Sequence, residues 1–304
     1  MRLEDGPAIG RRPGELNTLP DLPVAVTVEQ GDGGDRRDAG LPVVRVDDGA
    51  ATAVDGPGTV AGVLLAAGTG SRFADGNKLL ATVDGEPIVR RAARTLLDAP
   101  VEPVVVVTGH EAERVRGALS SLPVRFVHND DYAAGQATSV RTGVRALTGG
   151  ADVAVSRGSS GGGHGGDGEH GDRQAHGDRQ AHGDEGSHEG DTARPQGSER
   201  VDAAVFALGD MPFVTPATVR ALVAAYRAGH GTALAAAYRG ERGNPVLFDR
   251  RYFDRLAAVE GDVGGRELLV HGDDSALVET GDPGVRRDVD TRRDLSRARD
   301  SGGE

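Results

Sequence analysis

The sequence predicts an α/β protein of three layers, in which helices cover both faces of a mostly parallel, Rossmann-like sheet. Short uninterrupted apolar runs such as Val60–Leu65 are suited to strands buried on both faces. Segments with apolar residues at helical spacing, such as Glu86–Leu97, follow these runs. The two kinds of segment alternate along the chain, and this order favours parallel strands joined by crossover helices.

The expected elements run from residue 60 to residue 226. Strands are assigned where polar residues are rare, and helices where apolar residues recur three or four positions apart. In chain order we expect strand Val60–Leu65, helix Glu86–Leu97, strand Pro103–Val107, helix Ala112–Leu119, strand Val124–Val127, helix Gln136–Leu147, strand Ala203–Leu208 and helix Pro216–Tyr226. Residues 59–149 and 201–299 are therefore expected to form one domain.

Two segments lack this periodicity. Residues 1–58 alternate proline, glycine and charge, so we expect a disordered extension, with an edge hairpin of Leu22–Val28 and Leu41–Val46 as the alternative. Residues 150–200 are rich in glycine and aspartate and carry histidines every six residues, at His164, His170, His176, His182 and His188. This spacing suits no single face of a helix or strand, so we expect a disordered insert, with a metal-binding tract as the alternative.

Composition narrows the classes of function. A net charge of −12 and a pI near 5.2 argue against a nucleic-acid partner, which a basic face would favour. The chain has no cysteine, which excludes thiolate metal sites and cysteine nucleophiles. No apolar stretch approaches the roughly 18 residues that span a membrane, so we expect no membrane partner and a cytoplasmic location. Of 35 basic residues only Lys78 is a lysine, a bias typical of a halophilic or GC-rich source.

A glycine-rich loop follows the first expected strand of the domain and is the first candidate site. It reads Leu65-Ala66-Ala67-Gly68-Thr69-Gly70-Ser71-Arg72 and continues to Lys78. Small residues allow backbone N–H groups to approach a triphosphate, and Arg72 and Lys78 offer positive charge to its oxygens. Phe73 replaces the third glycine of a dinucleotide fingerprint, and no Gly-Lys-Ser/Thr closes a P-loop. The alternative is a simple glycine turn with two solvated cations.

Carboxylates form the second candidate site. Asp210 comes directly after the strand Ala203–Leu208, at the edge where open α/β sheets bind ligands. Mg²⁺ favours one or two carboxylates together with phosphate oxygens, so Asp210 is a natural ligand. Asp290, with Asp288 as the other candidate, would supply the second carboxylate. The alternatives are a turn aspartate at position 210 and a cap of the final helix near position 290.

These motifs resemble the MobA-like NTP transferase superfamily, and its molybdenum cofactor cytidylyltransferase branch most closely. The resemblance covers roughly residues 60–149 and 201–298 and implies a nucleotidyltransferase fold. Its further motifs are Thr108-Gly109-His110, Asn129, Gly135-Gln136-Ala137-Thr138-Ser139, Gly209-Asp210-Met211-Pro212, Gly243-Asn244-Pro245, Gly261-Asp262-Val263-Gly264-Gly265-Arg266 and Asp288-Val289-Asp290-Thr291. Phe73 and Gly265 depart from the usual methionine and alanine without removing a chemical group.

The resemblance also implies roles for individual residues. It places Gly68, Arg72 and Lys78 on the triphosphate and Asp210 and Asp290 on Mg²⁺. The resemblance further assigns the remaining nucleotide contacts to Leu65, Ala66, Ala67, Gly70, Asn129 and Ser139, and the acceptor contacts to Asn244, Pro245, Asp262 and Arg266. Ala67 stands where the guanylyltransferase branch usually has glycine, which favours CTP.

The resulting hypothesis is transfer of CMP from CTP to a phosphorylated, pterin-like acceptor, with release of pyrophosphate. Catalysis is assigned to Lys78, Arg72 and Asp210, with Mg²⁺ as cofactor and hand-off of the product to a molybdoenzyme or its chaperone. Three alternatives remain open. They are a GTP-using molybdenum cofactor guanylyltransferase, a sugar-1-phosphate nucleotidyltransferase, and a non-enzymatic metal-binding protein that works through its histidine-rich tract.

Overall fold

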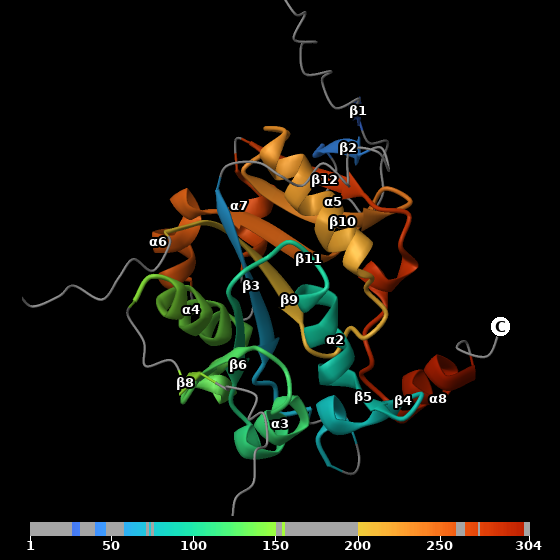
Figure 1. The fold of residues 1–304 in the computed structure, drawn as a ribbon. Coiled ribbons are helices and arrows are strands. Elements are labelled where there is room, and N and C mark those ends of the chain that lie inside the picture. The colour runs from blue at the N-terminus through green and yellow to red at the C-terminus, as the bar shows by residue number, and fades with distance from the viewer. Residues whose placement is uncertain are drawn as a thin grey trace, which may run out of the picture.

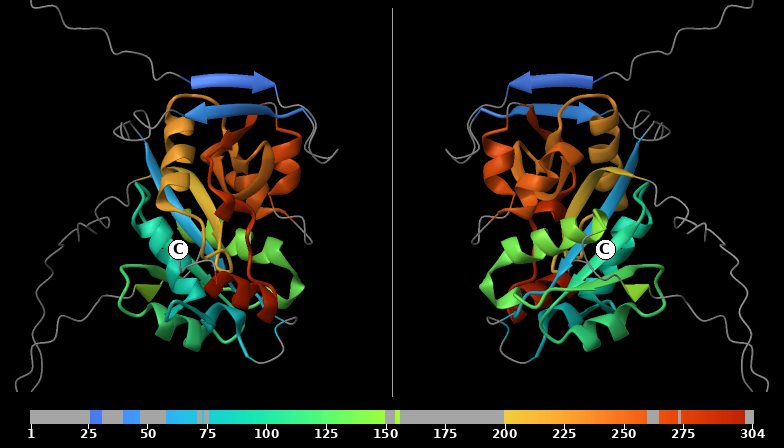
Figure 2. Two further views of the ribbon diagram at one scale, coloured as in Figure 1. Left: turned by 90° about the vertical axis from the view of Figure 1, so that its right-hand side faces the viewer. Right: turned by 90° about the vertical axis from the view of Figure 1, so that its left-hand side faces the viewer.

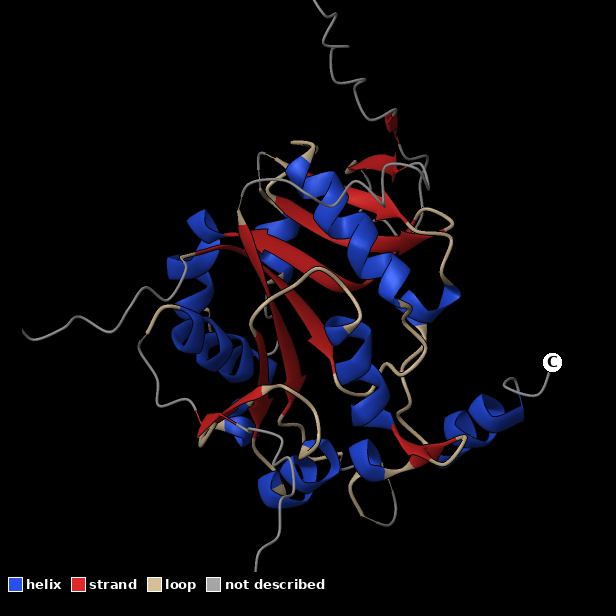
Figure 3. Ribbon diagram, in the orientation of Figure 1, coloured by secondary structure: helices blue, strands red, loops and turns tan. Residues whose placement is uncertain are grey.

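A ten-stranded sheet with helices on both faces forms the centre of the computed structural model (Figures 1 and 3). The structure describes residues 26–30, 40–46, 58–70, 73, 76–149, 154–155, 200–259, 265–272 and 274–300. In chain order the strands of this sheet are β1 (Val26–Gln30), β2 (Pro42–Val46), β3 (Thr59–Ala66), β6 (Val104–Thr108), β7 (Arg125–His128), β8 (Ala154–Val155), β9 (Val201–Leu208), β10 (Ala233–Tyr238), β11 (Glu241–Asp249) and β12 (Ser275–Glu279).

The sheet is mostly parallel, as the sequence predicts. Its order is β1-β2-β12-β10-β11-β9-β3-β6-β7-β8. Only β1, β8 and β11 run antiparallel to their neighbours among the described strands. A separate two-stranded ribbon pairs β4 (Thr82–Val83) with β5 (Glu86–Pro87).

Helices form two layers around the sheet. The helices are α2 (Ile88–Leu97), α3 (Ala112–Leu119), α4 (Gln136–Leu147), α5 (Pro216–Arg227), α6 (Phe253–Ala257), α7 (Arg266–Val270) and α8 (Arg292–Asp300), with 3₁₀ turns η1 (Lys78–Leu80), η2 (Tyr132–Ala134), η3 (Arg250–Tyr252) and η4 (Pro283–Arg286). One buried cluster joins α2, α3 and α5 to the sheet, and a second joins α4, α6 and α7 to its other face. Side chains alternate between them along β3, with Leu64 in the first and Leu65 in the second. The expected three-layer α/β/α class is confirmed.

The eight elements expected between residues 60 and 226 are all present. Helices α3 and α4 have the expected bounds, and the strand bounds differ by at most two residues. The helix expected from Glu86 begins instead at Ile88, because Glu86 and Pro87 pair with β4 as strand β5.

The expectation of disorder for residues 1–58 is wrong for part of that segment. Strand β2 pairs in parallel with β12 and in antiparallel with β1, which matches the edge-hairpin alternative. Val43 and Val44 are buried on opposite faces of the sheet, and this burial stabilises the strand. Figure 2 shows β1 and β2 at the end of the sheet farthest from α3.

The predicted insert lies mainly outside the described residues. Ala154 and Val155 form β8, which pairs with Arg125 and Phe126 of β7, and the described chain resumes at Arg200. The histidine-rich part of the insert belongs to the residues that are not described.

The register of the central strands brings three loops together. Leu65 of β3 lies opposite Leu208 of β9, and Ala66 lies opposite Thr108 of β6. The three parallel strands therefore end at one edge of the sheet, the edge at which open α/β sheets bind ligands.

In the part of the chain that is described, no helix is both long enough and apolar enough to cross a bilayer.

Candidate active site

The glycine-rich loop follows β3 directly and folds back against Lys78. Gly70 has a φ of +58°, which favours glycine, and a Cβ atom there would lie 3.3 Å from Lys78 Cγ. The N–H of Phe73 donates to the carbonyl of Gly70 at 2.8 Å and closes a turn. Arg72, predicted to contact the phosphates, lies outside the described residues.

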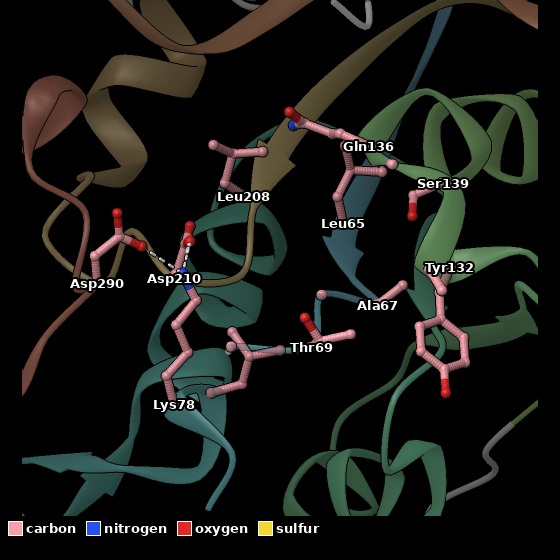
Figure 4. A pocket seen from close by; sticks show the side chains of 15 residues that line it. Leu65, Ala67, Thr69, Lys78, Tyr132, Gln136, Ser139, Leu208, Asp210 and Asp290 are labelled. Carbon is pink, nitrogen blue, oxygen red and sulfur yellow. Dashed lines mark hydrogen bonds and ion pairs between the residues drawn. The ribbon is translucent and has the colours of Figure 1, made fainter. Parts of the chain in front are cut away.

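Lys78 lies between two carboxylates (Figure 4). Its Nζ donates to Asp210 Oδ2 at 2.6 Å and to Asp290 Oδ1 at 2.7 Å. Asn77 caps the 3₁₀ turn η1, which begins at Lys78, because its Oδ1 accepts the N–H of Leu79. This cap fixes the backbone that carries the lysine. Burial alone would lower the pKa of Lys78, but the charges and hydrogen bonds of Asp210 and Asp290 outweigh it and leave the pKa raised. Lys78 is therefore held as an ammonium ion.

Backbone contacts bring the two carboxylates together. Asp210 follows Gly209, whose N–H donates to the carbonyl of Leu65 at 2.9 Å. The N–H of Val289 donates to the carbonyl of Asp210, also at 2.9 Å, so Asp290 enters the site beside it. The final helix has a different cap, in which Thr291 N–H and Oγ1 donate to Asp294 Oδ2 at 2.9 and 2.6 Å. Thr291 and Asp294 thus supply the cap of this helix, while Asp290 pairs with Lys78.

The carboxylate pair has the donor set that Mg²⁺ prefers. Asp210 and Asp290 already converge on one positive charge, and an incoming triphosphate could supply further oxygens. No group of three or more His, Cys, Asp or Glu side chains suited to a metal occurs within the described ranges. Asp288 is exposed and does not line the adjoining cavity. Its pKa is raised by burial of part of its surface and then by the charge of Asp290.

A cavity of about 390 Å³ adjoins Lys78 and is the candidate nucleotide site. In Figure 4, Lys78, Asp210 and Asp290 lie on one side of it, and Tyr132 and Ser139 lie on the other. The cavity is lined by Leu65, Ala67, Gly68, Thr69, Gly70, Lys78, Leu79, Tyr132, Ala133, Gly135, Gln136, Ser139, Leu208, Asp210 and Asp290. Tyr132 and Gln136 line the cavity and are not among the site residues predicted from the sequence.

Asn129, which the resemblance places near the base and ribose, is turned toward the protein. Its Nδ2 donates to Thr138 Oγ1 at 2.8 Å and to Ser139 Oγ at 3.0 Å, and its Oδ1 accepts the N–H of Asp131 at 3.1 Å. Asn129 is buried and does not line the cavity. In the structure Asn129 therefore contacts Ser139 and not the candidate nucleotide site.

Ala67 is also buried, and its methyl group lies beside Gly109. A Cβ atom added to Gly109 would come within 2.8 Å of Ala67 Cβ and 2.6 Å of Tyr132 Cβ. Only glycine at position 109 therefore allows the loop and Tyr132 to approach this closely.

A second cavity, of about 380 Å³, lies next to the first. The two share Leu65, Gln136 and Leu208. Of the predicted acceptor residues, Asn244 and Arg266 line the second cavity, Pro245 faces a small void beside Met211, and Asp262 lies outside the described residues. Phe206 and Phe248 give the second cavity apolar walls.

Arg242 also lines the second cavity, although it is not among the residues predicted from the sequence. It stands directly before Gly243-Asn244-Pro245, so its position next to that motif was the available signal. With Arg266 it gives the second cavity two guanidinium groups.

The chain is similar in sequence to known proteins. A family model for the MobA-like NTP transferase domain matches residues 62–276. The nicotine blue oxidoreductase of Paenarthrobacter nicotinovorans is 39% identical over 84 residues, which is 28% of this chain and 41% of that protein. A probable molybdenum cofactor guanylyltransferase of Haloferax mediterranei is 35% identical over 86 residues, with the same two shares, 28% and 41%. The matched segment thus spans less than half of each curated relative.

Solved structures share the fold over a longer range. The manganese complex of Rv0371C from Mycobacterium tuberculosis superposes with a TM-score of 0.54 and 22% identity, covering 80% of this chain and 99% of that one. At this level of identity the likeness extends to the fold.

Proposed function

This chain belongs to the MobA-like NTP transferase family, and on that premise we propose that it transfers CMP from CTP to a phosphorylated, pterin-like acceptor and releases pyrophosphate. The observation that carries the proposal is the position of Lys78, Asp210 and Asp290. They converge beside a cavity of about 390 Å³, and a second cavity that shares three lining residues with it is lined by Arg242 and Arg266.

The chemistry needs positioning and charge rather than an enzyme nucleophile. A phosphate oxygen of the acceptor attacks the α-phosphorus of CTP, and the bond from that phosphorus to the pyrophosphate breaks in line. The backbone of Gly68, Thr69 and Gly70 would hold the triphosphate, and Lys78 would donate to the oxygens of the departing pyrophosphate. Asp210 and Asp290 would hold a divalent metal, Mg²⁺ in our proposal, which supplies Lewis-acid stabilisation of the phosphate charge when bound.

The second cavity is suited to an acceptor that is both flat and anionic. Phe206 and Phe248 offer apolar surface to a ring system, and Arg242 and Arg266 offer guanidinium groups to a phosphate. Because Gln136 borders both cavities, it would lie close to the point where the acceptor phosphate meets the α-phosphate.

GTP is the second candidate nucleotide. The similarity to the probable guanylyltransferase of Haloferax mediterranei supports it. Ala67 supports CTP, because the resemblance assigns alanine at this position to the cytidylyltransferase branch.

The test is a labelling experiment with each of the four NTPs, labelled at the α-phosphate, and with either molybdopterin (with and without molybdate) or a sugar 1-phosphate as acceptor. We expect metal-dependent labelling of the acceptor from CTP and a weaker signal from GTP. Labelling from GTP alone would select the guanylyltransferase. Labelling of a sugar 1-phosphate in place of molybdopterin would select the sugar nucleotidyltransferase.

A further inference from the structure

The ammonium group of Lys78 occupies the space between the two carboxylates proposed to hold the metal. It is 2.6 Å from Asp210 Oδ2 and 2.7 Å from Asp290 Oδ1. A magnesium ion bound to the same two oxygens would lie about 2.0–2.1 Å from each. The two cations would therefore need nearly the same position, and their charges would repel.

The side chain of Lys78 can also turn toward the nucleotide cavity. The same residue lines the nucleotide cavity together with Gly68, Thr69 and Gly70, where backbone groups can meet a triphosphate. Its backbone is fixed by the Asn77 cap at η1, but its side chain is long and has several rotatable bonds. Gly70 lies against Lys78 Cγ and leaves room for the chain to turn. A triphosphate would give the ammonium a new anionic partner.

We propose that Lys78 and a divalent metal compete for the position between Asp210 and Asp290, so that the metal binds tightly only when a triphosphate draws Lys78 away. This inference rests on the proposed function, because it assumes that the two carboxylates hold a metal. It predicts that metal and nucleotide enter together, and that metal alone meets two carboxylates already paired with the ammonium of Lys78.

The first measurement is a titration with Mn²⁺ in the absence of nucleotide, with free Mn²⁺ followed by electron paramagnetic resonance. Lys78→Met removes the competing charge and keeps an unbranched side chain. Arg94→Met is the matched control, because Arg94 is half-exposed, pairs with Glu86 at 3.3 Å and lines neither cavity, and its loss changes the net charge equally. We expect Lys78→Met to bind Mn²⁺ at least tenfold more tightly than the wild type, and Arg94→Met to bind it like the wild type.

The second measurement uses the wild-type protein and does not depend on the folding of a variant. Lys78 is the single lysine of the chain, so ¹³Cε-lysine labelling gives one side-chain NMR signal. We expect Mg²⁺ alone to leave this signal unmoved at concentrations that saturate Lys78→Met. Addition of CTP with Mg²⁺ should shift it as the ammonium changes partners.

The outcomes separate the two proposals. If Lys78→Met binds Mn²⁺ no more tightly than the wild type, or Mg²⁺ saturates the wild-type site while the Lys78 signal stays in place, metal and ammonium bind side by side. Each carboxylate has a second oxygen that would allow this, and competition would then be overturned with the proposed function intact. If neither protein binds Mn²⁺, even with CTP present, both proposals fail.

Discussion

The backbone N–H of Val289 donates a hydrogen bond to the carbonyl oxygen of Asp210, 2.9 Å away. Val289 is fully buried and packs in a cluster with Val83 and Ile88. Because Asp290 is the next residue, this one contact sets the distance between two carboxylates that are far apart in the sequence. The arrangement of the site therefore depends on main-chain contacts and core packing before any ligand is present.

Replacement of Lys78 by alanine should lower turnover far more than stability. A lost charge-assisted contact to a phosphate in the transition state costs about 2–4 kcal/mol, or a rate loss of roughly 30- to 1,000-fold. The ion pairs of Lys78 are partly exposed, so their loss should affect unfolding much less. Steady-state kinetics and urea denaturation of the same sample check this. Unchanged kinetics would remove Lys78 from the site.

Asp210→Asn and Asp290→Asn should each lose most of the activity, and the double variant should lose little more. Residues that act through one metal ion are strongly non-additive. Thr291→Ala is the control, because Thr291 caps the last helix and should cost about 0.5–2 kcal/mol of stability without changing the rate per folded molecule. Additive rate losses at Asp210 and Asp290 would indicate that the two residues act independently.

Asp282 lies outside the candidate active site and should contribute to the stability of the fold. Its carboxylate accepts hydrogen bonds from Thr215 N–H and Oγ1, Thr218 Oγ1 and Gly284 N–H, at 2.7–2.9 Å, and so joins the start of α5 to η4. Asp282→Ala should lower the free energy of unfolding by about 1–3 kcal/mol or more, because these donors lose a buried acceptor. Asp254→Ala, at an exposed position of α6, is the matched control. Equal urea midpoints for the two variants would refute this role.

The insert should be dispensable for fold and activity. Removal of Ser156–Glu199 requires a linker, because β8 and β9 are four strand positions apart, or about 19 Å at 4.8 Å per strand. Eight glycine and serine residues reach that far, since an extended chain covers about 3.3 Å per residue. We expect the melting temperature and turnover of this variant to stay close to those of the full chain. A folded but inactive variant would make the insert functional.

Ala67→Gly should weaken the preference for CTP over GTP without abolishing catalysis. One methyl group discriminates by only about 1–3 kcal/mol, and Ala67 is buried against Gly109, so its effect would pass through the shape of the loop. Competition between CTP and GTP on one acceptor measures the ratio for both proteins. A wild-type preference for GTP would contradict the assignment of the nucleotide.

The sequence predicts the elements that carry strong local signals. Helix α4 has apolar residues at regular helical spacing and begins directly after Gly135, so the sequence predicts both of its bounds. Strand β10 reads Ala-Leu-Ala-Ala-Ala-Tyr, a composition with weak strand preference, and it forms because the adjoining strand β11 and the more distant strand β12 both pair with it. The strand β2 depends in the same way on β12.

The candidate site was predictable in its residue types but not in its contacts. The positions of Asp210 and Lys78 after strands of a parallel sheet place both at one edge. Nothing in the spacing indicates that Lys78 pairs with both carboxylates, or that Asn129 directs its hydrogen bonds to Thr138 and Ser139. Those contacts form where separate segments pack together, whereas hydrophobic periodicity describes only one segment at a time.

The most direct test of nucleotidyl transfer at this site follows the α-phosphate and the γ-phosphate of CTP in parallel reactions. CTP labelled separately at the α- and γ-phosphates is incubated with molybdopterin, Mg²⁺ and either the wild type or Asp210→Asn. We predict that the α-label enters the acceptor and the γ-label enters pyrophosphate in equal amounts, that chelation of the metal stops both, and that Asp210→Asn retains little of either. Release of γ-label as inorganic phosphate with no α-label on the acceptor, or full activity in Asp210→Asn, would contradict this account.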